Sequence, residues 1–286
     1  NFTVNDAIAD SVASAVMTVN VTAVNDAPTT SNSTVTTDED TDHTFTAAEF
    51  NFADVDTGAA LASVQITSLE TAGKLQLNGV DVILNQVITK TDIDANKLKF
   101  VPADDANGAG YATFNFTVND GTTDSVASAV LTIDVTAVND APTLATMSTL
   151  TGATEDTAFV FALADFGFND VDSGAQLQSI AVTTLSSTGT LTLNDSAVTL
   201  DQSISRSDIE AGNLKFTPAA NANGTGYDSF KFTVNDGTAD SSASSTMTID
   251  VTAVNDLPTG TDKTVTATED TAFVFTVADF GFTDVE

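Results

Sequence analysis

The chain has 286 residues, and its 40 acidic and 8 basic residues give a formal net charge of -32. A polyanion of this strength excludes nucleic acid and anionic membrane surfaces as direct partners and favours cations. The hydrophobic content of 42% argues against the disorder that such a charge could indicate, and the absence of cysteine excludes disulfides and thiolate metal sites.

The sequence repeats itself along its length. The run "VTAVNDAP" begins at Val21 and returns unchanged at Val135, 114 residues later, and "VTAVNDLP" begins at Val251, a further 116 residues on. The motifs "FTVND", "EDT" and Phe-x-Phe followed by an acidic loop also recur, at intervals of 114 or 116 residues. Self-similarity at a fixed period predicts an array of similar domains.

The repeats divide the chain into four segments. Residues 1–26 are the C-terminal end of one repeat, residues 27–140 and 141–256 are two complete repeats, and residues 257–286 are the N-terminal part of another. A repeat of this length is the usual size of one domain and can bury its own core. Because the sequence starts and stops within a repeat, we expect it to be a segment of a longer array.

Each repeat shows the period-2 alternation of β-strands. In "FNFTV", Phe114 and Phe116 share one face, and in "LTIDVTA", Leu131, Ile133 and Val135 do the same. Turn sequences such as "LNG", "NDG" and "NANGTG" separate these runs, and "TDIDANKL" could form one helical turn. About seven short strands per repeat predict an all-β fold of immunoglobulin-like antiparallel β-sandwiches.

Acidic and amide side chains recur at strand ends and in loops. They are Asn25, Asp26, Glu39, Asp54, Asp56, Asp92, Asp94 and Asp120 in the first copy, Asn139, Asp140, Glu155, Asp170, Asp172, Asp208, Glu210 and Asp236 in the second, and Asn255, Asp256 and Asp284 in the last. Several Asp oxygens in flexible loops suit Ca²⁺, which takes six to eight oxygen ligands at about 2.3–2.6 Å. Because these like charges would otherwise repel one another, the pattern predicts Ca²⁺ as a cofactor.

Other acidic residues are expected to face solvent without a role. They are Asp134 and Asp250 on strands, and Glu49, Asp165 and Asp279 before the Phe-x-Phe motifs.

The order of these motifs resembles that of cadherin repeats. "VTAVNDAP" resembles the cadherin linker, "TDED" and "FADVDTGA" the glutamate and Asp-x-Asp motifs that follow it, "TDID" and "SDIE" the Asp-Arg-Glu motif, and "FTVNDGTTDS" the strand that ends in Asp-Gly. The Thr-rich, Cys-free composition of the repeats is similar to that of the cadherin-like tandem repeats of large secreted bacterial adhesins of the RTX or biofilm type. The resemblance covers essentially the whole chain and implies cadherin-like β-sandwiches arranged in tandem as a rod.

The resemblance also implies a calcium site at each junction between repeats. At the central junction the ligands would be Glu39, Asp92 and Asp94 from the earlier repeat, Asn139 and Asp140 from the linker, and Asp170, Asp172 and Asp236 from the later repeat. Pro142 would stiffen the linker because its φ is fixed. One departure is that Ala23, Ala137 and Ala253 stand where the cadherin linker has its first Asp, so the number of ions per junction stays open.

These observations favour a calcium-stiffened structural extender segment of a long extracellular bacterial adhesin or surface filament that supports cell adhesion or biofilm formation. Its partners would be the neighbouring repeats of the same chain, together with other copies of the array or a host or surface ligand reached through domains outside this segment. No apolar run reaches the roughly 18 residues that a membrane helix needs, so we expect a secreted or cell-surface protein without membrane insertion.

Two other functions compete with this one. The first is a cadherin-like module that binds a glycan or another copy of itself, but such sites usually need exposed aromatics, and the chain has no Trp and only Tyr111 and Tyr227. The second is a hydrolase with paired carboxylates. A catalytic acid needs its pKa raised in a pocket, and such a pocket would not be copied into every repeat, so we expect no enzyme.

Overall fold

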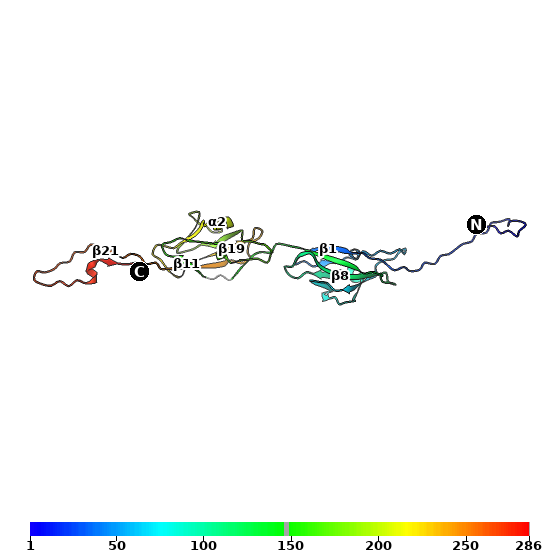
Figure 1. Ribbon diagram of the computed structural model, residues 1–286, viewed down its shortest axis with the longest axis horizontal. Coiled ribbons are helices and arrows are strands. Elements are labelled where there is room, and N and C mark those ends of the chain that lie inside the picture. The colour runs from blue at the N-terminus through cyan, green and yellow to red at the C-terminus, as the bar shows by residue number, and fades with distance from the viewer. Residues whose placement is uncertain (146–148, 286) are drawn as a thin grey trace. The chain divides into compact units, whose positions relative to one another are not determined.

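Figure 1 shows the computed structural model of the chain, in which residues 1–145 and 149–285 are described. The chain forms two compact units, Asn1–Val138 and Asn139–Glu286, called unit 1 and unit 2 below. About 8% of the residues are helical and 39% lie in strands. Among the described residues, no helix has both the length and the apolar character needed to cross a membrane.

Unit 1 contains a sandwich of two sheets. The five-stranded sheet has the order β1 (Ser33–Asp38), β9 (Ala129–Thr136), β8 (Gly108–Asn119), β3 (Ser63–Ser68) and β6 (Val87–Thr89), and the four-stranded sheet has the order β2 (His43–Thr44), β7 (Leu98–Val101), β4 (Lys74–Leu77) and β5 (Val80–Asp81). All neighbouring strands are antiparallel except β1, which runs parallel to β9. The all-β sandwich expected from the sequence is confirmed, with this one parallel pair.

Unit 2 repeats this arrangement. Its five-stranded sheet is β11 (Leu150–Thr154), β20 (Ser245–Thr252), β19 (Gly224–Asn235), β14 (Ser179–Thr184) and β17 (Ser203–Ser205), and its four-stranded sheet is β12 (Phe159–Val160), β18 (Leu214–Thr217), β15 (Thr190–Leu193) and β16 (Ser196–Ala197). The strands β10 (Thr143–Leu144) and β13 (Phe168–Asn169) form a separate two-stranded sheet, and β21 (Thr259–Gly260) pairs with β22 (Phe282–Thr283) near the C-terminus.

Short helical turns complete the units. The α-helical turns are α1 (Lys90–Asp94) and α2 (Arg206–Glu210), and the 3₁₀ turns are η1 (Ala47–Phe50), η2 (Leu163–Phe166) and η3 (Val277–Phe280). The one helical turn expected from "TDIDANKL" is α1, and the side chain of Thr89 caps its N-terminus by accepting a hydrogen bond from the backbone N–H of Asp92.

Each unit has one hydrophobic core between its sheets, and phenylalanine dominates both. The inward residues of β8, among them Phe114 and Phe116, are fully buried, as the alternating pattern predicts. The rings of Phe50 and Phe116 meet edge to face with centroids 5.0 Å apart, and those of Phe166 and Phe232 repeat the contact in unit 2 at 5.2 Å. Such pairs add to the stabilisation that burial of apolar surface supplies.

Two strand aspartates hold a bulge in place. The pairing of β8 with β9 shifts register near the start of β8, where Gly110 has a φ of 61°. Its backbone N–H donates to Asp134 Oδ1 at 2.6 Å, and Gly226 donates to Asp250 Oδ1 at the same distance in unit 2. The expectation that Asp134 and Asp250 are merely solvated is therefore wrong, because each pairs a backbone group that the bulge removes from the sheet.

Three further carboxylates close the 3₁₀ turns. The backbone N–H groups of Thr46, Ala162 and Thr276 donate to Glu49, Asp165 and Asp279 respectively, each at 2.7 Å. A carboxylate three residues into a helical turn can reach back in this way to a donor that the turn leaves unpaired. These residues have a local structural role, which corrects the expectation that they are plain surface positions.

Candidate metal centres

Three separate stretches of unit 1 bring five of the expected site residues together. This group, called the head cluster, consists of Asn25, Asp26, Asp54, Asp56 and Asp120. Asn25 Nδ2 donates to Asp120 Oδ2 at 2.9 Å, and the backbone N–H of Asp26 donates to Asp56 Oδ2 at 2.8 Å. The backbone N–H of Asp56 in turn donates to Asp54 Oδ1 at 2.8 Å, which bends the Asp-x-Asp loop so that both carboxylates belong to one cluster.

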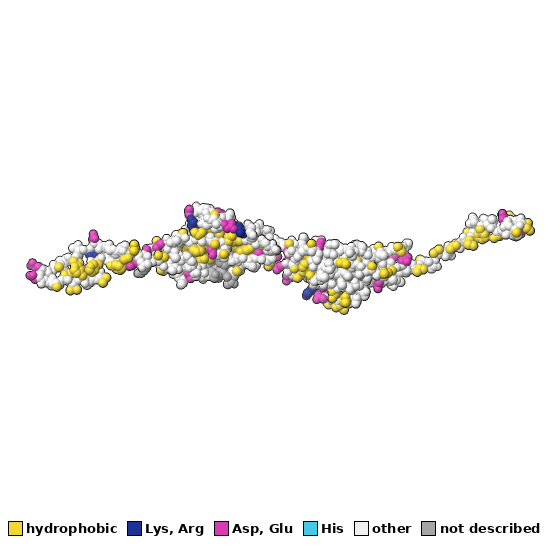
Figure 2. All heavy atoms as spheres, in the orientation of Figure 1, with side chains coloured by type: hydrophobic (Ala, Val, Ile, Leu, Met, Phe, Trp, Pro, Cys, Tyr) yellow, Lys and Arg dark blue, Asp and Glu magenta, His cyan; other side chains and the backbone are white. Residues whose placement is uncertain are grey.

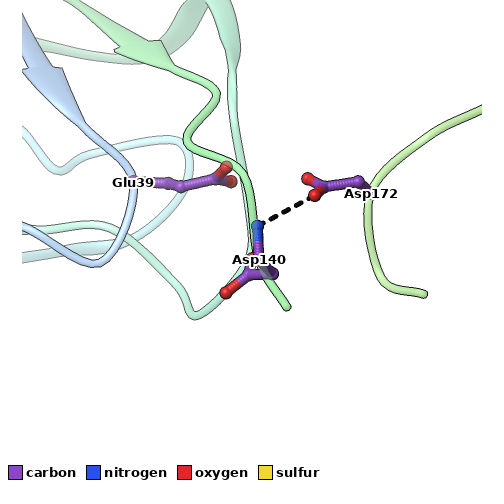
Figure 3. Close-up of side chains that lie close together, drawn as sticks. All are labelled: Glu39, Asp140 and Asp172. Carbon is purple, nitrogen blue, oxygen red and sulfur yellow. Dashed lines mark hydrogen bonds between the residues drawn. The ribbon is translucent and has the colours of Figure 1, made fainter. Parts of the chain in front are cut away.

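Unit 2 has the same head cluster with nearly the same distances. Asn139 Nδ2 donates to Asp236 Oδ2 at 3.0 Å, and the backbone N–H of Asp140 donates to Asp172 Oδ2 at 2.9 Å, the contact drawn in Figure 3. The backbone N–H of Asp172 donates to Asp170 Oδ1 at 3.0 Å. The agreement between the units shows that the arrangement follows from the repeated motif and not from chance contacts of acidic loops.

One carboxylate oxygen in each head cluster is buried without a hydrogen-bond partner. It is Oδ2 of Asp54 in unit 1 and Oδ2 of Asp170 in unit 2, the same atom of the same motif. Leaving a charged oxygen unpaired and out of water is unfavourable. A bound cation would remove this penalty, and the donor set of carboxylate and carbonyl oxygens fits a hard ion such as Ca²⁺.

The third member of each head cluster is an aspartate that closes its own turn. Thr123 N–H, followed by the Asn25 amide and Thr122 N–H, donates to Asp120 and holds the pKa of its carboxyl below the ordinary value. Burial acts to raise the pKa of Asp236, but the corresponding hydrogen bonds outweigh it and the net shift is also downward. Both side chains therefore stay ionised as the pH falls into the mildly acidic range, as metal ligands must.

Asn25→Ala should raise the pKa of Asp120 toward its ordinary value of 3.8 without reaching it, because the two backbone donors remain. A lowered native pKa stabilises the fold above the unfolded pKa, and this contribution is lost as the pH falls through the native value. Carbon-detected NMR titration of the carboxyl groups measures the shift. The pKa of Asp236 is the internal control and should not move; an unchanged pKa at Asp120 would contradict the role assigned to Asn25.

A second group, the tail cluster, lies where the chain leaves unit 1. Glu39 is only 3% exposed, and its two oxygens accept separate hydrogen bonds, Oε1 from the backbone N–H of Val138 and Oε2 from Asn107 Nδ2, both at 2.7 Å. Beside it, the backbone N–H of Asp105 donates to Asp40 Oδ1 at 3.1 Å. The glutamate thus holds the last residue of the unit in place.

The tail cluster of unit 2 is built in the same way. Glu155 is 2% exposed and accepts from the backbone N–H of Val254 at 2.7 Å and from Asn223 Nδ2 at 2.9 Å. The backbone N–H of Asn221 donates to Asp156 Oδ1 at 2.9 Å. The loop residues of both tail clusters were not predicted from the sequence, because "DDANG" and "NANG" are typical of ordinary turns. The one feature that could have identified Asn107 and Asn223 is that an Asn directly before Gly recurs in both loops.

The structure does not place Asp92 and Asp94 with Glu39. They lie on α1, which follows β6, and the last residue of β6 pairs with Ser63, which also pairs with Asn119 at the C-terminal end of β8. Glu39 lies near the opposite end of the sandwich, next to the start of β8. The expectation that these two aspartates join the tail cluster is wrong, and the same register excludes Asp208 and Glu210 from the tail cluster of unit 2.

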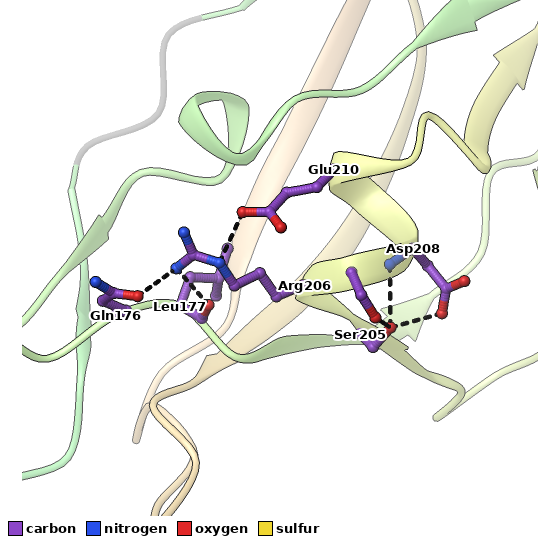
Figure 4. A network of polar contacts seen from close by, with 7 residues as sticks. Gln176, Leu177, Ser205, Arg206, Asp208 and Glu210 are labelled. Atoms are coloured by element: carbon purple, nitrogen blue, oxygen red, sulfur yellow. Dashed lines mark hydrogen bonds and ion pairs between the residues drawn. The ribbon is translucent and has the colours of Figure 1, made fainter.

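These four carboxylates instead have partners on or beside their own helical turns. The pairs are Asp92 with Lys97, Asp94 with Lys90, Asp208 with Ser205 and Glu210 with Arg206. The hydrogen bond from Lys97 is the main cause that holds the pKa of Asp92 below its ordinary value. Figure 4 shows how Arg206 joins α2 to the loop before β14, with Nε donating to Glu210 Oε1 at 2.8 Å and Nη1 donating to Gln176 Oε1 at 2.9 Å.

The last copy of the motif is incomplete. Asn255 Nδ2 donates to the backbone carbonyl of Asp256, as Asn25 and Asn139 do to the residues that follow them. Asp284 follows β22, at the position of the first aspartate of the Asp-x-Asp loop. The residue at the second position, Glu286, lies outside the described residues.

Both units match models of cadherin-like protein families. Residues 28–136 match a family model described as cadherin-like, and residues 138–252 match a second model described as a cadherin-like domain. The chain carries two cadherin-like domains in tandem. Domains of this type are extracellular modules with adhesive or structural roles and are typically not enzymes. No curated protein matches the chain in sequence.

Solved structures that match the chain include cadherin fragments. Repeats 1–2 of human mucin-like protocadherin are 14% identical, with a TM-score of 0.40, over 79% of this chain and 98% of that one. The extracellular domain of protocadherin GammaB4 is 16% identical, with a TM-score of 0.41, over 80% and 34%. An endo-fucoidan hydrolase of glycoside hydrolase family 107 is 19% identical, with a TM-score of 0.25, over 80% of this chain and 29% of that one.

Proposed function

We propose that this chain is a calcium-stiffened extender segment of a long, secreted bacterial surface adhesin or filament that supports adhesion or biofilm formation. The observation that carries the proposal is the buried, unpartnered Oδ2 atom of Asp54 and of Asp170, each in a repeated cluster of oxygen ligands. The near-copy repeats and their likeness to the tandem repeats of bacterial adhesins support the assignment to a surface array.

The order of the clusters along the chain supports a cation at the linker between domains. Glu39 of one tail cluster holds the backbone of Val138, and the next two residues, Asn139 and Asp140, belong to the head cluster of the following domain. Val138 is therefore hydrogen-bonded to a carboxylate of the tail cluster, and the two residues that follow it are hydrogen-bonded to carboxylates of the next head cluster. In the proposal, Ca²⁺ takes its ligands from these carboxylates and from the linker.

Calcium fits this donor set better than the other common ions. The clusters offer carboxylate, amide and carbonyl oxygens from flexible loops and contain neither His nor Cys. Zn²⁺ and copper favour imidazole or thiolate ligands, and Mg²⁺ demands a near-ideal octahedron and retains several waters. Mg²⁺ therefore serves as the control ion for the experiment below.

A cation would limit bending at the linker in two ways. It would neutralise carboxylates that otherwise repel one another, and it would connect ligands whose positions within their own domains are already fixed by hydrogen bonds. A short linker with bound Ca²⁺ has fewer accessible orientations than the same linker without it. Restricting these orientations is what an extender requires, because domains that fold back on one another shorten the array.

We expect calorimetry to show Ca²⁺ binding to the chelated chain with an affinity of roughly 10⁻⁴ M or tighter, and small-angle scattering of the full chain to show a narrower distribution of dimensions in Ca²⁺ than in chelator. Asp170→Asn should weaken binding and broaden the distribution while the domains still unfold cooperatively. Asp94→Asn, outside both clusters, is the matched control and should change neither measurement.

The two measurements separate the two parts of the proposal. Absence of binding heat, or equal responses to Ca²⁺ and Mg²⁺, would reject calcium as the cofactor. Binding of Ca²⁺ with identical scattering in Ca²⁺ and in chelator would retain the metal site and reject the extender mechanism.

A further inference from the structure

One side edge of unit 1 exposes a group of aliphatic side chains. Val80, Ile83, Leu84 and Val87 are between 52% and 71% exposed, and all lie in an eight-residue segment that passes from β5, at the edge of one sheet, to β6, at the edge of the other. This group is called the apolar edge. Figure 2 shows hydrophobic side chains gathered at the lower rim of unit 1, where Figure 1 draws these strands in cyan.

The backbone beneath the apolar edge is firmly held. The backbone N–H of Ile83 donates to Gln86 Oε1 at 2.9 Å, and that of Gln86 donates back to the carbonyl of Ile83 at 3.0 Å. The backbone N–H of Asn85 donates to the carbonyl of Ile66 on β3 at 2.8 Å. Little conformational entropy would therefore be lost if this turn docked against a partner.

Unit 2 has the same turn but a more polar surface. Gln202 Oε1 accepts from the backbone N–H of Thr199 at 2.8 Å, as Gln86 does for Ile83. The positions of Val80, Ile83 and Val87 are occupied there by Ser196, Thr199 and Ser203. The fold thus accepts polar residues at these three sites, and the aliphatic side chains of unit 1 are not needed to form the turn.

The charge around the apolar edge also differs from the rest of the unit. Residues 61–101, which include β3 to β7, contain four lysines and four acidic residues, whereas the remainder of residues 27–140 contains 13 acidic residues and neither lysine nor arginine. Lys74 on β4 is exposed and, within the described part of the chain, has no carboxylate in ion-pair range. The apolar edge is thus the electrically balanced side of a strongly acidic domain.

We propose that the apolar edge is a self-association surface on which a second copy of this chain docks, edge to edge. Two copies with a net charge of -32 repel each other over most approaches, and only a side with balanced charge allows them to come into contact. An isologous contact also requires a self-complementary surface, which an apolar strip flanked by both lysines and carboxylates supplies. This surface lies within unit 1 alone and does not depend on the calcium proposal.

Sedimentation equilibrium of the full chain should show a reversible dimer with a dissociation constant of about 10–500 µM, as expected for an interface smaller than those of stable dimers. The triple variant V80S/I83T/V87S carries the residues of unit 2, so it should fold, and it should bind itself at least about tenfold more weakly. The matched control is Val126→Ser, which also introduces the unit 2 residue at a 94% exposed valine outside the apolar edge and should leave association unchanged.

A second variant tests the charge argument without altering an apolar residue. Lys74→Glu should weaken the dimer at low salt, and added salt should restore part of the affinity because it screens the new repulsion. A chain that stays monomeric throughout the concentration range would overturn the proposal, and the edge would then be free for a different protein. Association that V80S/I83T/V87S leaves intact, or that Val126→Ser weakens equally, would overturn it as well.

Discussion

Phe232→Ala is expected to lower the free energy of unfolding of unit 2 by about 3–5 kcal/mol, because truncation of a buried phenylalanine removes apolar contacts and leaves a cavity. Phe232 is fully buried on β19, and its ring meets that of Phe166 edge to face at 5.2 Å. The ring also lies 6.0 Å from that of Phe230. The cavity would therefore open in the centre of the aromatic group, where neighbouring strands cannot close it.

Urea unfolding followed by circular dichroism measures this loss. The equivalent Phe116→Ala should destabilise unit 1 by a similar amount and leave unit 2 unchanged. Phe282→Ala is the surface control, since that side chain is 56% exposed and should cost under about 1 kcal/mol. The losses should be equal in Ca²⁺ and in chelator; a loss seen only in Ca²⁺ would mean that the metal, rather than the aromatic core, holds the unit together.

The core of each unit could be read from the sequence because period-2 alternation is a local property. Phe114 and Phe116 share a face wherever the strand lies, and the structure buries both. The bulge at Gly110 could not be read in this way, because it adds two residues to β8 relative to β9, and an insertion of two keeps the alternation on either side in phase. Asp134 therefore resembled a solvated strand residue, although it accepts the hydrogen bond that the bulge leaves open.

The head clusters could be anticipated because their ligands belong to three motifs that recur together. The tail clusters were anticipated only in part. Glu39 was recognised, but its partner Asn107 lies 68 residues later in the loop "DDANG", whose two aspartates match none of the cadherin motifs. The prediction that the "TDID" segment joins the tail cluster was wrong because its similarity to a ligand motif is a local property of the sequence. The end of the sandwich at which the segment lies depends instead on the pairing of β3 with both β6 and β8.

Unit 2 has a buried aspartate that unit 1 lacks, and its removal is the second substitution expected to have a large effect on stability. Asp228 on β19 is only 4% exposed, and its carboxylate accepts from the backbone N–H groups of Ser187 and Thr188 at 3.0 Å and of Gly189 at 2.7 Å. Unit 1 has the fully buried Ala112 at the same position. The aspartate therefore fixes a loop that unit 1 holds without it, and alanine at this site is compatible with the strand.

The charge of Asp228 depends on a balance between two opposing effects. Burial acts to raise the pKa of its carboxyl, but the hydrogen bonds from Ser187, Gly189, Ser229 and Thr188 outweigh burial and bring the pKa below its ordinary value. A group with a lowered native pKa stabilises the fold above its unfolded pKa, about 3.9 for Asp, and this contribution is lost as the pH falls through the native value.

Asp228→Ala should consequently destabilise unit 2 by about 2–4 kcal/mol at neutral pH, because several backbone donors lose a charged acceptor. The loss should shrink as the pH falls from about 4 toward the lowered native pKa, because the unfolded chain takes up a proton at Asp228 before the folded chain does, and below the native pKa the folded carboxylate is protonated as well. Urea unfolding of both proteins across this pH range measures the difference. Asp228→Asn keeps one acceptor oxygen without the charge and should lie between them at neutral pH. A difference independent of pH would show that Asp228 acts by filling space, since only the hydrogen-bonded carboxylate can be lost by protonation.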